Sequence, residues 1–372
     1  MSNTRMLLLT FFAHLVFDGF ELVLPTLLPV VAQEFSLSYS QIGVLAGCLA
    51  ISLGAGQFLM GYLSDKTGKR KIFIVTGLLC LSVSFYFIGT SQSYGSLVIW
   101  NLLAGLGSSV YHPVSVSLIS QTYRERKGKA LGIHGAGGNL GMAAFPLVSG
   151  VLADMYGWRF VFKVFPVMGF VVCLLFFLLV KEESIVKKPV EFKNLFYLKI
   201  ATVVIALGFI SMASRGLHIF LPLKLSDLGY SSTDFGLFLS LFNGLGVLGQ
   251  FLGGYYSDIY EKTKMISILS VVSGVFMYVL LHADHYIVML GFVAIAGLTF
   301  NSIWPTLFGL LTDRTPEQLH GTGLGLFFSA GYVMGSSAPV LMGVVTDLVS
   351  MQISFILVPV FAGIGALVIL KR

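Results

Sequence analysis

The sequence predicts an all-α polytopic membrane protein in which twelve transmembrane helices form two pseudo-symmetric six-helix bundles. Of its 372 residues, 56% are hydrophobic and 11% are charged, whereas soluble domains carry about 25% charged residues. Apolar segments near or above the roughly 20 residues that cross a bilayer as a helix recur along the whole chain. Much of the first half also returns in the second half, about 193 residues later. These three observations together indicate the fold class.

The apolar segments define the spans in order. Each is long enough to satisfy its backbone hydrogen bonds as a helix inside a bilayer. The 42 glycines fit such helices, because small residues allow close backbone approach. The expected spans are residues 7–31, 40–63, 71–90, 95–119, 129–152, 159–180, 197–222, 233–257, 265–282, 286–311, 320–345 and 351–370.

The distribution of Lys and Arg predicts the orientation in the cytoplasmic membrane. With twelve spans, 19 of the 23 Lys and Arg residues lie at the end that carries both termini, so we expect that end to be cytoplasmic. The net charge of +6 follows from this topology and from contact with anionic membrane lipid, and no nucleic-acid partner is expected. Asp18 and Glu21 interrupt the first apolar segment, which also lacks a small-residue cleavage site, so we expect a retained helix.

The internal repeat divides the chain into two halves. The stretch QFLMGYLSD, which begins at Gln57, returns as QFLGGYYSD from Gln250, with seven of nine positions identical. Further matches in spans four and ten and in spans five and eleven keep nearly the same spacing, so a six-span unit has been duplicated in parallel. This predicts a bundle at 1–180, a cytoplasmic linker at 181–196 and a second bundle at 197–372. Two parallel bundles place a substrate site near the midplane between them.

One motif resembles a known family. The stretch GYLSDKTGKRK at residues 61–71 resembles the loop signature of the major facilitator superfamily between spans two and three, and the twelve spans, the repeat and the linker extend the resemblance over the entire chain. It implies a secondary active transporter that works by alternating access. GLGSSVYHP at residues 105–113 and GAGGNLG at residues 135–141 are similar to the fosmidomycin-resistance-type exporters of that superfamily.

The signature residues are candidates for gating. We expect Gly61 to let spans two and eleven pack closely, and Asp65 to meet the positive N-terminus of span eleven near residues 320–322. Neighbouring cations would be partners of Asp65, lipid anchors or only topology charges. In the second half Gly254 and Asp258 remain but the signature is incomplete, so a weaker latch is expected there. The gating candidates are Gly61, Asp65, Lys66, Arg70, Gly254 and Asp258.

Two departures from the superfamily's exporters affect the expected mechanism. Where proton-coupled drug exporters often carry an arginine in span four, this chain has Asn101 before Gly105, so coupling through that arginine is excluded. In span five the antiporter-type glycine pattern is partly replaced by Phe145 and Ser149. Antiport is therefore less well supported than transport itself.

Ionisable residues inside the spans are the first candidates for a substrate or proton site, because such groups are costly in a membrane. His14, Asp18 and Glu21 follow one another at spacings of four and three, on one helical face. The repeat aligns Asp18 with Arg215 and Glu21 with His218. In the structural interpretation Asp18 or Glu21 pairs with Arg215. In the functional one Arg215 receives an anionic substrate while a carboxylate exchanges protons.

Span four adds a histidine and span ten an aromatic counterpart. His112, followed by Pro113, can carry protons or donate to an anion, or it is a satisfied buried histidine. Its repeat partner Trp304 is either a wall of the cavity or part of the core. We therefore predict substrate binding by Arg215, His218, His112, Trp304 and Glu21, and proton coupling by Asp18, Glu21 and His112. Weaker candidates are His134, Asn139 and Tyr332, and we expect Arg159 and Lys163 to anchor the outer side.

The sequence lacks the motifs of an enzyme. It contains no Walker-type loop, no His-Glu-x-x-His pair and no nucleophile elbow. Cys48, Cys80 and Cys173 lack metal-ligand or disulfide spacing, so we expect small packing residues, no metal and no cofactor. The expected function is proton-coupled movement of a small organic molecule, with efflux of a drug-like or phosphonate-like compound favoured. Organic-anion uptake is the alternative, as is a transport-inactive receptor or scaffold. The expected partners are a small-molecule substrate, a proton and lipid, with a functional monomer.

Overall fold

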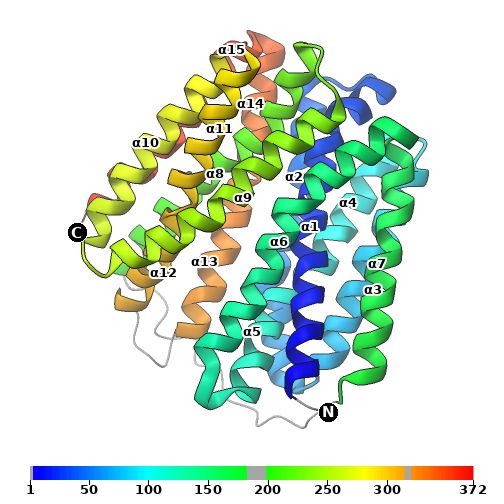
Figure 1. Ribbon diagram of the computed structural model, residues 1–372, viewed down its shortest axis with the longest axis vertical. Coiled ribbons are helices and arrows are strands. Elements are labelled where there is room, and N and C mark those ends of the chain that lie inside the picture. Colours follow the sequence, from blue (N-terminus) through cyan, green and yellow to red (C-terminus); the bar gives the residue numbers. More distant parts are fainter. Residues whose placement is uncertain (1–2, 182–197, 315–319, 372) are drawn as a thin grey trace.

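The chain forms long helices that lie side by side in two bundles (Figure 1). This computed structural model describes residues 3–181, 198–314 and 320–371. In those residues twelve helical segments are long and apolar enough to cross a membrane, which confirms the predicted fold class of a multi-pass membrane protein. The expected linker at 181–196 falls almost entirely outside the described residues, so the domain boundaries stay a prediction.

The first bundle contains six spans, the fourth of which consists of two helices. Its elements are α1 (Asn3–Phe35), α2 (Tyr39–Thr67), α3 (Arg70–Thr90), α4 (Tyr94–Ser108), α5 (Tyr111–Thr122), the 3-10 turn η1 (Arg124–Arg126), α6 (Lys127–Tyr156) and α7 (Trp158–Leu179).

The second bundle repeats this order with more interruptions. Its elements are α8 (Leu198–Asp227), α9 (Ser232–Ser257), α10 (Lys262–His282), α11 (Tyr286–Asn301), α12 (Ile303–Arg314), α13 (His320–Gly335), α14 (Ser337–Leu348), α15 (Met351–Ser354) and α16 (Leu357–Leu370). The breaks in spans four, ten and eleven each come just before Pro113, Pro305 or Pro339, because a proline has no N–H to donate to the preceding helical turn. Span five is continuous through Pro146.

We call the end at which α1 begins and α16 ends the terminal end, and the opposite end the far end. At the far end the two bundles are joined by two equivalent contacts. Asp347, near the end of α14, accepts hydrogen bonds from the N–H groups of Tyr39 and Ser40 at 3.0 and 2.8 Å and from the Ser40 hydroxyl at 2.5 Å. Tyr39 and Ser40 begin α2, so a carboxylate of one half satisfies free N–H groups at a helix start in the other half.

The second contact is the repeat-related copy of the first. Asp154, near the end of α6, accepts hydrogen bonds from the N–H groups of Ser232 and Thr233 at 3.0 and 2.8 Å and from the Thr233 hydroxyl at 2.6 Å. We call Asp154 and Asp347 with these partners the twin latches. Both lie at equivalent places in the repeat, 193 residues apart.

Glycines bring the backbones together beside the twin latches. A Cβ atom at Gly43 would collide with the carbonyl of Pro339, and one at the repeat-related Gly236 would collide with the carbonyl of Pro146. In the same spans five and eleven but nearer the terminal end, a Cβ at Gly132 of α6 or Gly325 of α13 would meet no described atom within 4 Å. The halves are therefore packed against each other at the far end, while the positions of Gly132 and Gly325 are open among the described residues.

The signature loop at the terminal end is ordered by a glycine and a buried arginine. Gly68 has φ of 69° and ends α2, with its N–H bonded to the carbonyl of Ser64, so this position requires a residue that tolerates the left-handed conformation. Arg70 is 4% exposed and donates to Asp65 at 3.1 Å and to Gln121 at 2.5 Å. In the first half the loop therefore links α2, α3 and α5.

The described residues place Gly61 against its own half, and its contact with span eleven stays a prediction. A Cβ at Gly61 would lie 3.1 Å from Pro113 of α5, in the same half, and the repeat-related Gly254 faces Pro305 in the same way at 3.8 Å. The side chains at 320–324, where Asp65 was expected to contact span eleven, lie outside the described residues. The glycines of the signature therefore allow close packing within each half.

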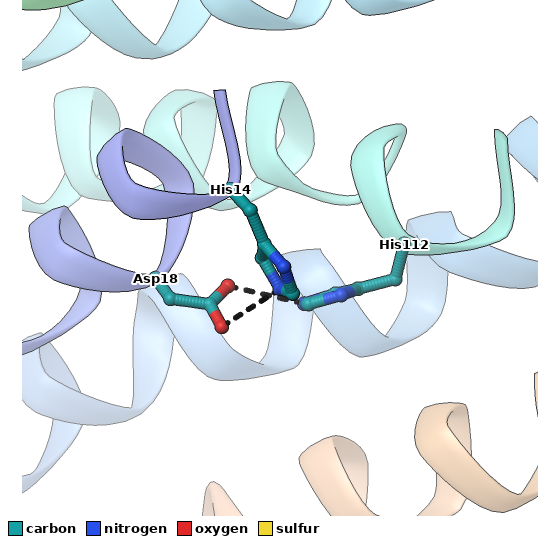
Figure 2. Close-up of side chains that lie close together, drawn as sticks. All are labelled: His14, Asp18 and His112. Carbon is teal, nitrogen blue, oxygen red and sulfur yellow. Dashed lines mark ion pairs between the residues drawn. The ribbon is translucent and has the colours of Figure 1, made fainter. Parts of the chain in front are cut away.

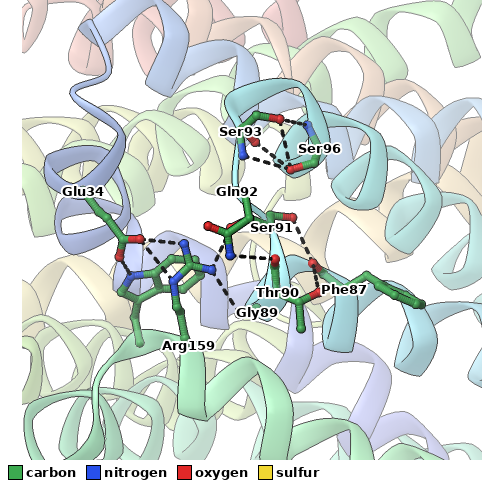
Figure 3. Close-up of polar contacts among 10 residues, drawn as sticks. Glu34, Phe87, Gly89, Thr90, Ser91, Gln92, Ser93, Ser96 and Arg159 are labelled. Carbon is green, nitrogen blue, oxygen red and sulfur yellow. Dashed lines mark hydrogen bonds and ion pairs between the residues drawn. The ribbon is translucent and has the colours of Figure 1, made fainter.

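A polar cluster ties the helices of the first half together at the far end (Figure 3). Arg159 donates to Glu34 at 2.6 and 3.1 Å and to the carbonyls of Gly89 and Ser91 at 3.2 and 2.7 Å. The indole of Trp158 also donates to Glu34, at 2.6 Å. Arg159, which was expected to anchor the outer side, thus joins α1, α3 and α7 through its guanidinium.

Candidate functional site

An ion pair crosses between the two halves in the middle of the bundle. Arg215 of α8 donates to Glu21 of α1 through a short charged contact. Tyr332 of α13 donates its hydroxyl to the other oxygen of Glu21 at 3.1 Å, and the Arg215 guanidinium lies 4.8 Å from the centre of the Tyr332 ring. Glu21 thus receives two donors, both from the opposite half. The sequence left open whether Asp18 or Glu21 pairs with Arg215, and the structure places Glu21 there.

A pocket adjoins this ion pair on the side nearer the far end. Its lining includes Glu21, Arg215 and His218 together with Asn101 and apolar residues of α1 and α2. Ser336 and Pro339 of the second half also line it. The pocket thus combines a cation, a carboxylate and an imidazole with apolar walls.

His218 is held in a defined orientation at the pocket. Its Nδ1 lies 2.8 Å from the carbonyl of Ser214, and the side-chain nitrogen of Asn243 lies 3.4 Å from its Nε2. Since a carbonyl only accepts, Nδ1 carries the proton and Nε2 accepts from the amide. His218 is therefore fixed as a neutral imidazole beside the cavity.

A second group of ionisable residues lies within the first half (Figure 2). The carboxylate of Asp18 is 3.0 Å from His14 Nε2 and 3.4 Å from His112 Nε2. We call His14, Asp18 and His112 the triad. Asp18 precedes Glu21 by three residues on α1, so the triad lies about 4.5 Å nearer the terminal end than the ion pair. Of the two acids that the sequence offered as partners of Arg215, Asp18 pairs instead with the two histidines.

Further side chains pack around the triad. His134 stacks on His14 with ring centres 4.2 Å apart, and its Nε2 is 3.4 Å from the Ser115 hydroxyl. The hydroxyl of Tyr111 donates to the carbonyl of Thr10 at 2.5 Å. The triad therefore rests on aromatic and polar groups of α5 and α6.

Trp304, predicted as a cavity wall, is not among the residues that line the pocket. Its ring lies 6.4 Å from that of Phe300 and 6.2 Å from that of Phe308. From there the aromatic contacts continue through Phe328, which stacks on His112 with ring centres 5.8 Å apart. Trp304 therefore reaches the triad only through two phenylalanines.

The remaining gating candidates lie at the terminal ends of α2 and α9. Lys66 is exposed near the end of α2, and Asp258 follows the end of α9, also exposed. In the second half the tie between neighbouring helices is made by Lys262 with Asp313 at 2.7 Å, which corresponds in the repeat to Arg70 with Gln121. Asp65 forms an ion pair with Arg70.

Sequence reasoning gave little weight to several residues that the structure brings between the halves. Tyr332 was a weak candidate, although it contacts both members of the ion pair. Its repeat partner Asn139 forms a reciprocal amide pair with Gln250, at 3.2 and 3.3 Å. Asp154 and Asp347, at equivalent positions of the repeat, were not among the candidates. The repeat contained the signal: polar residues at equivalent positions on helices that face the opposite half.

Comparison with known proteins relates the chain to membrane transporters. The family model of the Major Facilitator Superfamily matches residues 6–336 and 203–372. A probable nitrate transporter, NarT of Staphylococcus haemolyticus, is 24% identical over 356 residues, which cover 91% of this chain and 89% of that protein. The fosmidomycin resistance protein of Escherichia coli is 29% identical over 151 residues, which cover 39% of this chain and 36% of that protein.

A solved structure shares the fold. It is a bacterial homologue of the human lysosomal transporter Spinster in an inward-facing, unoccupied conformation, with a TM-score of 0.82 and 15% identity, covering 98% of this chain and 96% of that one. The family and the fold are those of transporters, and the family matches span nearly the whole chain. This polytopic membrane protein therefore belongs to the Major Facilitator Superfamily.

Proposed function

We propose that the protein is a proton-coupled symporter that takes up a small anionic solute by alternating access. The observation that carries this proposal is the Glu21–Arg215 ion pair, which crosses between the halves at the edge of a pocket. Arginine stays charged under all physiological conditions, and its planar fork matches carboxylate, nitrate or phosphonate groups. Arg215 is therefore the receptor for the anion.

Coupling to protons follows from the charge balance of the pair. An anion that binds Arg215 displaces Glu21 and leaves its carboxylate without its cation. A buried charge without a partner costs several kcal/mol, so Glu21 takes up a proton in exchange for the lost contact. One anion and one proton are then bound together, which is the stoichiometry of symport. Tyr332 supports the exchange because its hydroxyl contacts Glu21 and its ring contacts Arg215.

The contacts between the halves support a defined place for this state in the transport cycle. The twin latches close the far end. Nearer the terminal end, a Cβ atom added at Gly132 or Gly325 would meet no described atom within 4 Å. With both termini cytoplasmic, as the Lys and Arg distribution predicts, the state is inward-facing. Opening to the outside then requires both latches to break, and the signature residues around Asp65 and Arg70 brace the first half at the cytoplasmic end.

The other predicted residues keep supporting roles in this proposal. His218 lines the pocket with Arg215 and presents a fixed imidazole to the solute. His112 and Asp18 stay predicted participants through the triad, and Trp304 supports the aromatic path toward it. No cofactor is assigned, and the working unit is a monomer in contact with membrane lipid.

Export of a phosphonate-like compound is the second candidate function. It is favoured by the partial match to a fosmidomycin resistance protein, which is 29% identical over 151 residues. Arg215 would serve that solute equally, because a phosphonate is also an anion. The two candidate functions differ in the direction of the proton, which moves with the solute in symport and against it in export.

Transport by purified protein in liposomes distinguishes these functions. Nitrate, a short carboxylate and a phosphonate are offered under inward and outward proton gradients to the wild type, Arg215→Ala, Arg215→Lys and Glu21→Gln. Symport predicts that an inward proton gradient drives accumulation of an anion and that Arg215→Ala abolishes its uptake. Uptake driven only by an opposing proton gradient indicates export. A folded protein that moves none of the anions and binds none of them contradicts the proposal and favours a receptor or scaffold.

A further inference from the structure

The triad has the composition and geometry of a metal site. His14 Nε2, an oxygen of Asp18 and His112 Nε2 all lie within 4.8 Å of one another, and Figure 2 shows the two imidazoles converging on the carboxylate. Their side chains are 10%, 14% and 17% exposed, respectively. We propose that the triad binds a divalent first-row transition-metal ion.

The orientation of His14 is the strongest argument. Its Nδ1 lies 2.8 Å from the carbonyl of His134, and because a carbonyl only accepts, this nitrogen must donate. If Nε2 carries no proton, its lone pair faces Asp18 Oδ2, 3.0 Å away. At this distance a cation must lie between the two atoms, either a proton on Nε2 or a metal ion. Histidine ligands of metals are commonly fixed in this way, by donating their other nitrogen to a carbonyl.

The contact of His14 Nε2 with Asp18 is an ion-pair contact whose geometry is not that of a hydrogen bond. His14 is 8% exposed, and its buried Nε2 has no hydrogen-bond partner among the described residues, although Asp18 is near. A nitrogen buried to this degree normally has a partner. A metal ion between the nitrogen and the carboxylate would supply it, because coordination does not require the carboxylate to lie along an N–H direction.

The spacing of the ligand atoms fits a small cation. Ligands about 2.1 Å from a tetrahedral ion lie about 3.4 Å from one another. The nitrogen–oxygen distances in the triad are 3.0 Å from His14 to Asp18 Oδ2 and 3.4 Å from His112 to Asp18 Oδ1. The full set spans up to 4.8 Å, so binding would shorten the longest of these separations by about 1.4 Å. One of the three ligands, His112, belongs to α5, and the other two belong to α1. The ion would therefore hold α5 against α1.

The ligand types select the class of metal. Two imidazoles and one carboxylate suit Zn²⁺, Co²⁺, Ni²⁺ or Fe²⁺, whereas Ca²⁺ and Mg²⁺ prefer oxygen ligands and Cu⁺ prefers sulfur. Three protein ligands leave a fourth position for water or for an oxygen of a bound solute. The charged and titratable groups around the triad are His134, Tyr111, Glu21 and Arg215, and none of them is required as a ligand.

Metal binding by the purified full-length protein tests this proposal and requires no transport measurement, so it can fail independently of the anion symport. The protein carries a tag without histidine and is stripped of metal. Co²⁺ is followed by visible absorption and Zn²⁺ by calorimetry. All variants are made in a His282→Gln, His285→Gln background, because these two exposed histidines flank Asp284 and could bind an ion at the surface.

We expect one ion per chain in the background protein. Asp18→Asn and His112→Gln should weaken binding by more than about 100-fold, since removing even an outer partner of a metal ligand costs about 10–100-fold. His218→Gln, which removes a buried histidine of the other half, is the matched control and should bind as the background does. Size-exclusion chromatography verifies that each variant is folded.

Two results would overturn the proposal. One is the absence of Co²⁺ and Zn²⁺ binding in the background protein, which would show that wild-type binding, if any, is at the exposed histidines. The other is binding that survives Asp18→Asn and His112→Gln unchanged. If both variants fail to fold, X-ray absorption of Co²⁺ in the background protein decides: two imidazole nitrogens and a carboxylate oxygen support the triad, and any other ligand set excludes it.

Discussion

The twin latches lead to a quantitative prediction about how the far end opens. Asp154 and Asp347 each accept two backbone N–H groups and one hydroxyl from a helix start in the opposite half, at 2.5–3.0 Å. Losing a helix cap costs about 1 kcal/mol, and both carboxylates are exposed, which keeps their charge contribution small. Removing both costs about 2 kcal/mol, or about 30-fold in the equilibrium between closed and open far ends.

The assay measures the distance between the halves at the far end. Nitroxide labels are placed at Gln92 and His285, which are exposed and related by the repeat, in a background without native cysteines. Pulsed EPR should show a growing population of longer distances in Asp154→Ala and Asp347→Ala. The two single effects should be equal because the contacts are equivalent, and they should add in the double variant because the sites share no partners.

A matched control separates a latch from a general effect of removing an acid. Glu34→Ala also removes a far-end carboxylate, but its partners Arg159 and Trp158 belong to the same half. This variant should leave the distance distribution unchanged. If the double latch variant shows the wild-type distribution, or if only one of the two carboxylates matters, the account of the far end as two equivalent latches is wrong.

Three further predictions concern the ion pair and the far-end cluster. Arg215→Lys should retain weak anion uptake while Arg215→Ala abolishes it, because lysine keeps the charge but loses the fork; equal uptake by both in liposomes would exclude Arg215 as the receptor. Glu21→Gln imitates the protonated carboxyl, so anion exchange should persist while accumulation driven by a proton gradient disappears, and retained accumulation would place coupling elsewhere. Arg159→Ala should lower stability by about 1–2 kcal/mol, because the carbonyls of Gly89 and Ser91 lose their donor; an unchanged thermal unfolding midpoint in detergent would contradict this role.

The sequence predicted the spans well because hydropathy and charge act locally. Each apolar segment must form a helix in a bilayer, whatever its neighbours are. Contacts between helices were harder to predict. Gly61 was expected to face span eleven, and the described residues place it against Pro113 of its own half. Arg159 was expected to anchor the outer side, and its guanidinium binds Glu34. In both cases the partner lies far along the chain, where no local pattern indicates it.

By itself, the sequence determined that the protein has two duplicated six-helix halves, a transporter-family signature, and acids in span one opposite bases in span seven. Only the tertiary structure decided that Glu21 is paired with Arg215 and that Asp18 is paired with His14 and His112. The repeat fixes the depth and face of a side chain to within about one helical turn. Which contact forms within that turn depends on the tilt and rotation of each helix. The glycine contacts and the twin latches between the halves determine that tilt and rotation.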